Sequence, residues 1–166
     1  MSVYVVDIQN EQDFPGFPTE RVVDAIRFVL TRHEVEPGMT LTVVVTDDEH
    51  VQQLNNEYRD VDAPTDILSF PADPLPEEID EEAPYLGDLI IAYPYTAHQS
   101  AEAGHALSDE LVLLVVHGTL HLLGYDHDNA ENQDAMWSEQ AYTLASLDIP
   151  VAIDVPRFTF GDDVVT

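Results

Sequence analysis

A segment with a long apolar stretch and three histidines constrains this chain more than any other feature. It runs from Leu111 to His127 and has the sequence L-V-L-L-V-V-H-G-T-L-H-L-L-G-Y-D-H. Its apolar part predicts a helix that is buried on most of its surface. His117 and His121 are about one helical turn apart, roughly 6 Å of rise, so both imidazoles should project from the same face. We therefore expect the fold to be built around this helix.

The end of this segment predicts a third histidine close to the first two. Gly124 directly follows the apolar residues, where a helix commonly ends in a left-handed residue that glycine adopts at little cost. The chain can then turn back and bring His127 toward His117 and His121. Three neutral imidazoles with a fourth position left open are the ligand set of a catalytic zinc site. The alternative is that these are core histidines, each with its own buried hydrogen-bond partner.

The histidine pattern differs from that of the common zinc proteases at one position. Those enzymes carry the helix motif H-E-x-x-H, in which the glutamate is the general base. Gly118 stands at that position here. A protease of that kind is therefore not expected.

The composition limits both the class of protein and the ligands available to a metal. With 166 residues and 45% hydrophobic content, the chain should be one globular domain with a genuine core. It has no cysteine, so histidine and carboxylate must supply any metal ligands. We expect no membrane span, because no stretch approaches 18 uncharged apolar residues, and no signal peptide at Met1–Gln9. A cytoplasmic location is the expectation.

The charge of the chain is strongly negative. Five arginines, no lysine and 33 acidic residues give a formal net charge of -28. Most of these carboxylates should lie on a solvated surface, which repels nucleic acid at low salt. The absence of lysine also suggests adaptation to high salt, where a Debye length of about 3 Å at 1 M would mute the self-repulsion.

Alternating β-rich and amphipathic segments predict an α+β fold with one domain. Strands are expected at residues 2–8, 40–45, 67–70 and 86–92, and helices at 19–35, after Thr46, at 95–103, from Ser108, and at 131–147. Thr19, Thr46 (with Glu49 in a capping box) and Ser108 are the expected helix N-caps. The proline-rich, acidic segment Ala72–Tyr85 should be an exposed loop. We divide the chain into a domain at residues 1–147 and a tail of unknown role at 148–166.

Three stretches of the chain resemble the YbeY family of bacterial metal-dependent endoribonucleases, and they occur in the family's order. They are L-N-N-E-Y-R-D-V-D-A-P-T-D-I-L-S-F-P (Leu54–Pro71), Y-L-G-D-L-I-I (Tyr85–Ile91) and, most specific, H-G-T-L-H-L-L-G-Y-D-H (His117–His127). The resemblance implies a mixed four-stranded sheet packed with about five helices and a zincin-like metal site on a buried helix. It also implies one zinc ion held by His117, His121 and His127, although nickel also accepts imidazole.

The same resemblance implies a function and partners. It predicts cleavage of single-stranded RNA, maturation of ribosomal RNA at the 3′ end of the small-subunit RNA, and a part in ribosome quality control. The expected partners are RNA and the ribosome, or a basic ribosomal protein that suits the acidic surface, and neither DNA nor a membrane. Two alternatives stay open: another zinc hydrolase, acting on a peptide or small amide, and a ribosome assembly factor whose zinc is mainly structural.

Arg59 is the expected catalytic cation. It is the arginine that lies inside a family motif, and a guanidinium can grip phosphate with two hydrogen bonds. The alternative is a structural ion pair with Asp60 or Asp62. No side chain stands out as a general base.

The remaining polar residues of the motifs are expected to have mainly structural roles. Thr65, Asp66 and Ser69 should cap turns and fix their loop by hydrogen bonds. Asp88 and Asp126 could each orient a ligand histidine, although Asp88 could equally hold the start of its strand. Outside the motifs, His33, His50, His98 and His105 are interpreted as surface or helix residues.

Overall fold

The structure, a computed structural model that describes residues 4–72 and 84–150, is a four-stranded mixed sheet with five helices. The strands are β1 (Val5–Asn10), β2 (Thr40–Thr46), β3 (Ile67–Pro71) and β4 (Tyr85–Ala92). The helices are α1 (Thr19–Arg32), α2 (Asp48–Arg59), α3 (Tyr93–Ala103), α4 (Leu107–Leu122) and α5 (Ala130–Ser146). The predicted α+β class, sheet and helix number are confirmed.

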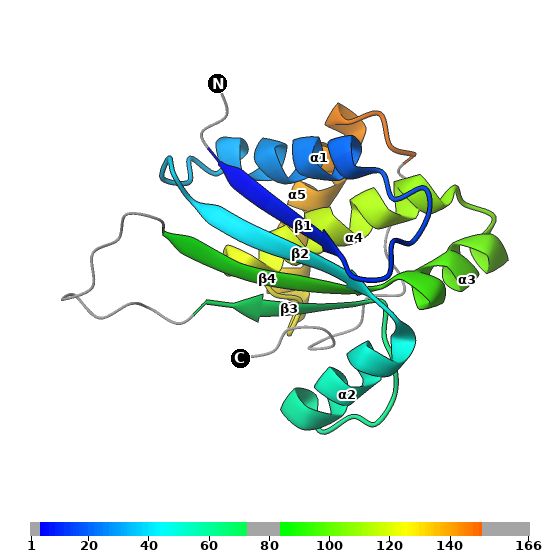
Figure 1. Ribbon diagram of the computed structural model, residues 1–166. Helices are drawn as coiled ribbons and strands as arrows, with labels where there is room; N and C mark the ends of the chain where they lie inside the picture. The colour runs from blue at the N-terminus through cyan, green and yellow to red at the C-terminus, as the bar shows by residue number, and fades with distance from the viewer. Residues whose placement is uncertain (1–3, 73–83, 151–166) are drawn as a thin grey trace.

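The sheet has the strand order β1-β2-β4-β3. β1, β2 and β4 are parallel, and β3 pairs antiparallel with β4 at one edge. α1 and α4 lie against one face of the sheet, and α5 packs on the far side of α4 (Figure 1). α4 is therefore enclosed between the sheet and two other helices.

This enclosure explains the sequence of α4. From Glu110 to Leu122 every residue of the helix is buried, which is why the segment is apolar on all sides rather than on one stripe. It shares one hydrophobic core with Leu41, Val43 and Val45 of β2, Leu89 and Ile91 of β4, and Ile67 of β3. The prediction of a buried central helix is confirmed.

The opposite face of the sheet has a smaller core. Leu68 of β3 and Ile90 of β4 pack there with Val51 of α2. Side chains of a strand alternate between faces, so β3 contributes to both cores. This alternation decides which residues of β3 and β4 can reach α4.

Two predicted N-caps at the start of α1 and α4 are wrong. α4 begins at Leu107 after Ala106, so Ser108 lies inside the first turn. There its hydroxyl accepts a hydrogen bond from Arg21 of α1 at 2.8 Å. The hydroxyl therefore makes a contact between two helices and does not cap its own helix. α1 follows Pro18, which places Thr19 inside the helix.

The predicted capping box of α2 is also wrong. Thr46 is the last residue of β2. Asp47 is the N-cap instead, and its carboxylate accepts from the backbone N–H of His50 at 2.8 Å. This contact and the hydrogen bond from Gln12 lower the pKa of Asp47. Aspartate is a preferred N-cap residue, and here it occupies the N-cap position directly after the strand.

Some expectations cannot be compared with the structure. Most of the proline-rich segment and of the tail, residues 73–83 and 151–166, lies outside the described residues. Within the described part of the chain, no helix has both the length and the hydropathy needed to cross a membrane.

Candidate metal centre

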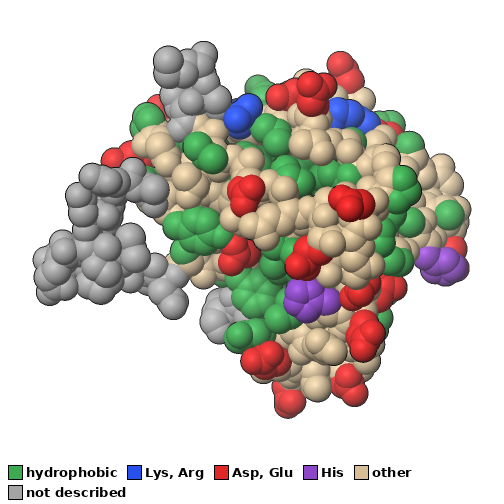
Figure 2. Space-filling view, viewed as in Figure 1, with side chains coloured by type: hydrophobic (Ala, Val, Ile, Leu, Met, Phe, Trp, Pro, Cys, Tyr) green, Lys and Arg blue, Asp and Glu red, His purple; other side chains and the backbone are tan. Residues whose placement is uncertain are grey.

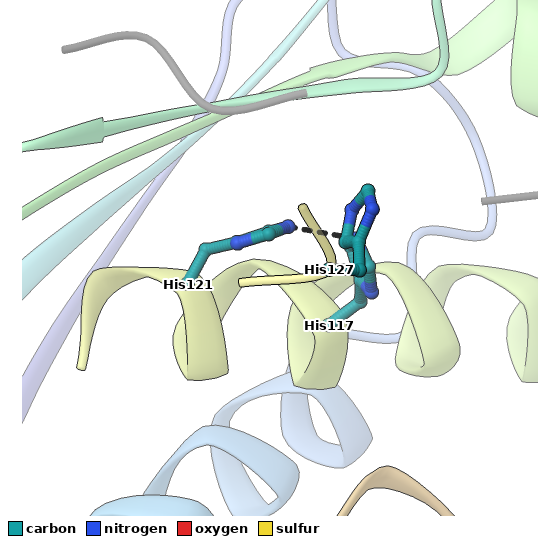
Figure 3. A group of neighbouring side chains, drawn as sticks. All are labelled: His117, His121 and His127. Carbon is teal, nitrogen blue, oxygen red and sulfur yellow. Dashed lines mark hydrogen bonds between the residues drawn. The ribbon is translucent and has the colours of Figure 1, made fainter. Parts of the chain in front are cut away.

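Two histidines of α4 face one another across a short gap. His117 and His121 are one turn apart, and their Nε2 atoms are separated by 3.1 Å. The ring centroids are 4.5 Å apart, with the ring planes perpendicular. Figure 3 shows both side chains on the same side of the helix. The predicted common face is confirmed.

The turn after α4 brings the ring of His127 next to those of His117 and His121. Gly124 has φ +102. The N–H of Gly124 donates to the backbone carbonyl of His121, and the N–H of Tyr125 donates to the carbonyl of Leu120, both at 3.0 Å. These two bonds form a Schellman motif, which reverses the chain at a left-handed glycine. The ring of His127 then lies 5.4 Å from that of His117 and 5.0 Å from that of His121.

The three histidines form a cluster that could bind a metal ion. One nitrogen from each ring can be chosen so that all lie within 4.8 Å of one another. The rings are buried, with 0%, 3% and 0% of each residue exposed. Neutral imidazole is the form that binds metals. Among the described residues, no further histidine or carboxylate joins this cluster.

Hydrogen bonds on the outer side of two rings determine where their protons lie. The Nδ1–H of His117 donates to Oε1 of Gln140 at 3.0 Å. The Nδ1–H of His121 donates to the backbone carbonyl of Tyr125 at 2.9 Å. Both acceptors are oxygens, so each Nδ1 must carry the proton and each Nε2 a lone pair. The two lone pairs point into the 3.1 Å gap and repel unless positive charge lies between them.

The distance between two of these nitrogens fits a zinc ion. With Zn–N bonds of about 2.0–2.1 Å and tetrahedral angles, two ligand nitrogens lie about 3.3 Å apart. The Nε2 atoms of His117 and His121 are already at 3.1 Å. A donor set of three imidazoles suits zinc, copper, iron or nickel rather than magnesium or calcium.

A tryptophan of α5 packs against the cluster. The ring of Trp137 lies 5.9 Å from that of His117 and 5.3 Å from that of His127. α5 thus closes one side of the site with Trp137 and, one turn later, with Gln140.

Gly118 allows α4 to lie close to the sheet. A Cβ added there would be 2.7 Å from Cδ2 of Leu89 and 3.2 Å from Oγ of Ser69. A glutamate at this position, as in the protease motif, would be directed into the sheet rather than toward the histidines. The geometry thus supports the exclusion of that class of protease.

Arg59 is the last residue of α2 and is half-buried. Its Nη1 donates to Oδ1 of Asn55 at 3.2 Å. Asn55 is buried, and its own amide donates to the carbonyl of Ala63 at 2.8 Å. The loop that follows α2 and the guanidinium of Arg59 are therefore held by the same asparagine.

The predicted hydrogen-bonding role fits Asp66 but not Ser69. Asp66 is buried, and its carboxylate accepts from the N–H of Ile67 and from the amide of Gln99. Thr65 also donates to it, at 3.5 Å. Ser69 is buried with its hydroxyl against Gly118, and that hydroxyl has no hydrogen-bond partner among the described residues.

Asp88 does not orient a ligand histidine. Leu89 faces α4 at Gly118, so its neighbour Asp88 points to the opposite face of the sheet. There it accepts a hydrogen bond from the hydroxyl of Tyr85. Asp126 accepts from the backbone N–H of His127 at 2.7 Å and so holds the turn.

The histidines outside the motifs have contacts on other elements. His50 lies near Thr46 and Glu11, and His98 near Glu102 on α3. His33 ends α1 and contacts the hydroxyl of Tyr125 at 3.0 Å. It therefore supports the turn whose carbonyl accepts from His121.

Three groups around the cluster were not predicted from the sequence: Gln140, Trp137 and the carbonyl of Tyr125. Gln140 lies within an otherwise ordinary amphipathic helix, and a polar residue at a buried position of the α5 pattern was its only signal. A backbone carbonyl leaves no signal in the sequence.

Acidic side chains are common on the surface of the molecule. Figure 2 shows Asp and Glu side chains dispersed over the visible face, with basic side chains near its upper border, by α1. Arg21 pairs there with Asp109, and Arg32 pairs with Glu139. The Arg32 guanidinium lowers the pKa of Glu139.

Comparison with known proteins gives consistent matches. A family model described as Endoribonuclease YbeY matches residues 7–148. A protein of that name from Acetivibrio thermocellus is 33% identical over 159 residues, which cover 90% of this chain and 98% of that protein. Another from Streptomyces coelicolor is 39% identical over 142 residues, 82% of this chain and 86% of that protein.

A solved structure has the same fold. The solution structure of a Thermotoga maritima protein covers 92% of this chain and 98% of its own, with a TM-score of 0.55 and 20% identity. That likeness concerns the fold alone, whereas the family model and the relatives cover most of the sequence at higher identity. This chain belongs to the YbeY endoribonuclease family.

Proposed function

We propose that this protein is a zinc-dependent endoribonuclease that hydrolyses single-stranded RNA. The observation that carries the proposal is the convergence of His117, His121 and His127, with the Nε2 atoms of the first two 3.1 Å apart. Together with membership of an endoribonuclease family, this cluster favours a metal-assisted hydrolase. Nickel is the second candidate metal, since it also accepts imidazole.

The three histidines would hold the ion, and Arg59 would contact the phosphate. A zinc ion bound there would supply Lewis acidity toward a phosphoryl oxygen. The half-buried guanidinium of Arg59, fixed by Asn55, would grip the phosphate and offset its negative charge. In a chain with a net charge of -28, these cations supply the local attraction for RNA.

The biological substrate in this proposal is ribosomal RNA. We propose maturation of the 3′ end of the small-subunit RNA and a part in ribosome quality control, in the cytoplasm. The acidic surface suits the ribosome or a basic ribosomal protein as docking partner, and neither DNA nor a membrane is expected. Residues 1–147 would form the catalytic domain, and residues 148–166 are assigned no role.

Two other functions are less well supported. A peptide or amide hydrolase would need a general-base carboxylate, and the position that carries it in zinc proteases is Gly118, which is packed against Leu89. A purely structural zinc normally has four protein ligands, whereas the cluster has three among the described residues. A fluorogenic peptide panel, and pull-down of ribosomal subunits by a His121→Ala variant, test these alternatives.

The test of the proposed function is cleavage of single-stranded RNA by the wild type and by His121→Ala. The variant should lose both the metal and the activity and keep the fold, as judged by circular dichroism. His98→Ala is the matched control, because His98 is an exposed histidine on α3. An active His121→Ala enzyme would contradict the proposal.

A further inference from the structure

Gln140 makes an unusual contact for a residue in the middle of an amphipathic helix. Its side chain is fully buried, and its Oε1 lies 3.0 Å from Nδ1 of His117. The two residues are 23 positions apart and belong to different helices. Burial of an amide is costly unless it is hydrogen-bonded, so this contact accounts for a glutamine where a hydrophobic residue would otherwise pack.

The contact fixes the proton of His117. A neutral imidazole has one N–H and one lone pair, and the partner of one nitrogen determines the role of the other. An oxygen acceptor at Nδ1 holds the proton there. The lone pair is then on Nε2, which faces Nε2 of His121. A ring with the proton on Nε2 could not use that nitrogen to bind a metal.

Trp137 of the same helix adds a second contact to the site. It precedes Gln140 by three residues, so the two side chains share one face of α5. Its ring lies against those of His117 and His127, at 5.9 and 5.3 Å. α5 therefore restricts the orientation of one ring by packing and sets the proton of another by a hydrogen bond.

We propose that Gln140 is a positioning residue of the metal centre: it accepts the Nδ1–H of His117 and so directs the Nε2 lone pair toward the ion. The inference rests on the proposed metal site. The essential property is the oxygen acceptor at this position. An amide supplies it without adding negative charge to a buried site. Outer partners of this kind typically change metal affinity by about 10- to 100-fold.

Zinc affinity of three variants tests the assignment, measured by competition with a chromophoric chelator. Gln140→Leu removes the acceptor at similar size and should weaken zinc binding by about 10- to 100-fold. Gln140→Glu keeps an oxygen acceptor and should bind zinc at least as tightly as the wild type. Leu144→Val is the control, because Leu144 is a fully buried residue of the same helix, and it should leave zinc affinity unchanged.

The tautomer of His117 gives a second readout that needs no metal. In metal-free protein labelled with ¹⁵N-histidine, long-range ¹H–¹⁵N spectra should show the Nδ1–H form of His117 in the wild type and in Leu144→Val. In Gln140→Leu the Nε2–H form should appear.

Each outcome decides the assignment. Unchanged zinc affinity in Gln140→Leu, or equal weakening in Leu144→Val, would overturn it. So would a His117 tautomer that does not respond to Gln140→Leu. A wild type that binds no zinc would instead contradict the proposed metal site, and the tautomer spectra would still decide whether Gln140 sets the proton of His117.

Discussion

The Nε2 atoms of His117 and His121 lie 3.1 Å apart, while the Nδ1 atom of each ring donates a hydrogen bond to an oxygen on its outer side. Two lone pairs therefore face each other in a buried site. Their contact becomes favourable when either a shared proton or a metal ion lies between the two nitrogens. The proposed function depends on this relationship.

Replacement of Arg59 should separate phosphate recognition from metal binding. In Arg59→Ala the zinc content should stay at the wild-type level, while kcat/KM for RNA falls by roughly 100-fold or more, because the proposed donor to the phosphate is lost. Arg21→Ala is the control, since Arg21 is exposed and pairs with Asp109. Unchanged RNA cleavage by Arg59→Ala would remove Arg59 from the site.

Gly87 should be intolerant of a side chain because it lies where α4 meets β3. Its φ is +147, and an added Cβ would crowd the carbonyl of Phe70 and Cδ2 of Leu122. Gly87→Ala should therefore destabilise the fold by about 2–4 kcal/mol, combining backbone strain with overpacking. In the control Gly38→Ala the residue also has a positive φ, +94, but nothing lies within 4 Å of the added Cβ. Urea unfolding measures the free energy of unfolding of both variants. Equal losses of stability in the two would contradict the crowding at Gly87.

The phenol of Tyr85 should lose its proton at a higher pH than an ordinary tyrosine does. Burial, and then the hydrogen bond to Asp88, raise the pKa of its phenol from 10.0 to about 12. Because the pKa in the folded state is the higher one, the stability linked to it is fully present below pH 10 and is lost as the pH rises toward 12. Absorbance at the tyrosinate band should show a late component that Tyr85→Phe reduces; the rest belongs to Tyr125, whose pKa burial also raises. A titration that Tyr85→Phe leaves unchanged would be inconsistent with this assignment.

The charge of -28 should make the fold more stable in concentrated salt. At about 1 M the Debye length is roughly 3 Å, so repulsion between surface carboxylates is largely screened. The melting temperature should rise from dilute buffer to molar potassium chloride, a salt chosen because sulfate stabilises proteins generally by exclusion. The absence of any rise would count against the hypothesis of adaptation to salt.

The central helix and its histidine cluster were predictable because their signals are local. The i, i+4 spacing of His117 and His121 places both rings on one face whatever the rest of the fold does. Gly124 marks the helix end, since the Schellman turn requires a left-handed residue there. The alternation of strands and helices was likewise predictable from short-range periodicity.

The parts that could not be predicted depend on distant contacts. Gln140 and Trp137 meet the histidines because α5 packs against α4, and their own segment carries no spacing that reveals it. Serine is a preferred N-cap residue, but the hydroxyl of Ser108 accepts a hydrogen bond from Arg21 of another helix. Asp88 lies in a family motif, yet the alternation of β4 directs it away from α4.

Metal content and RNA cleavage, measured on one preparation with and without chelator, test the central claim most directly. The account predicts about one equivalent of zinc per chain, cleavage of single-stranded RNA, loss of cleavage with loss of the metal, and its return when zinc is restored. Full cleavage activity in protein stripped of metal would contradict it.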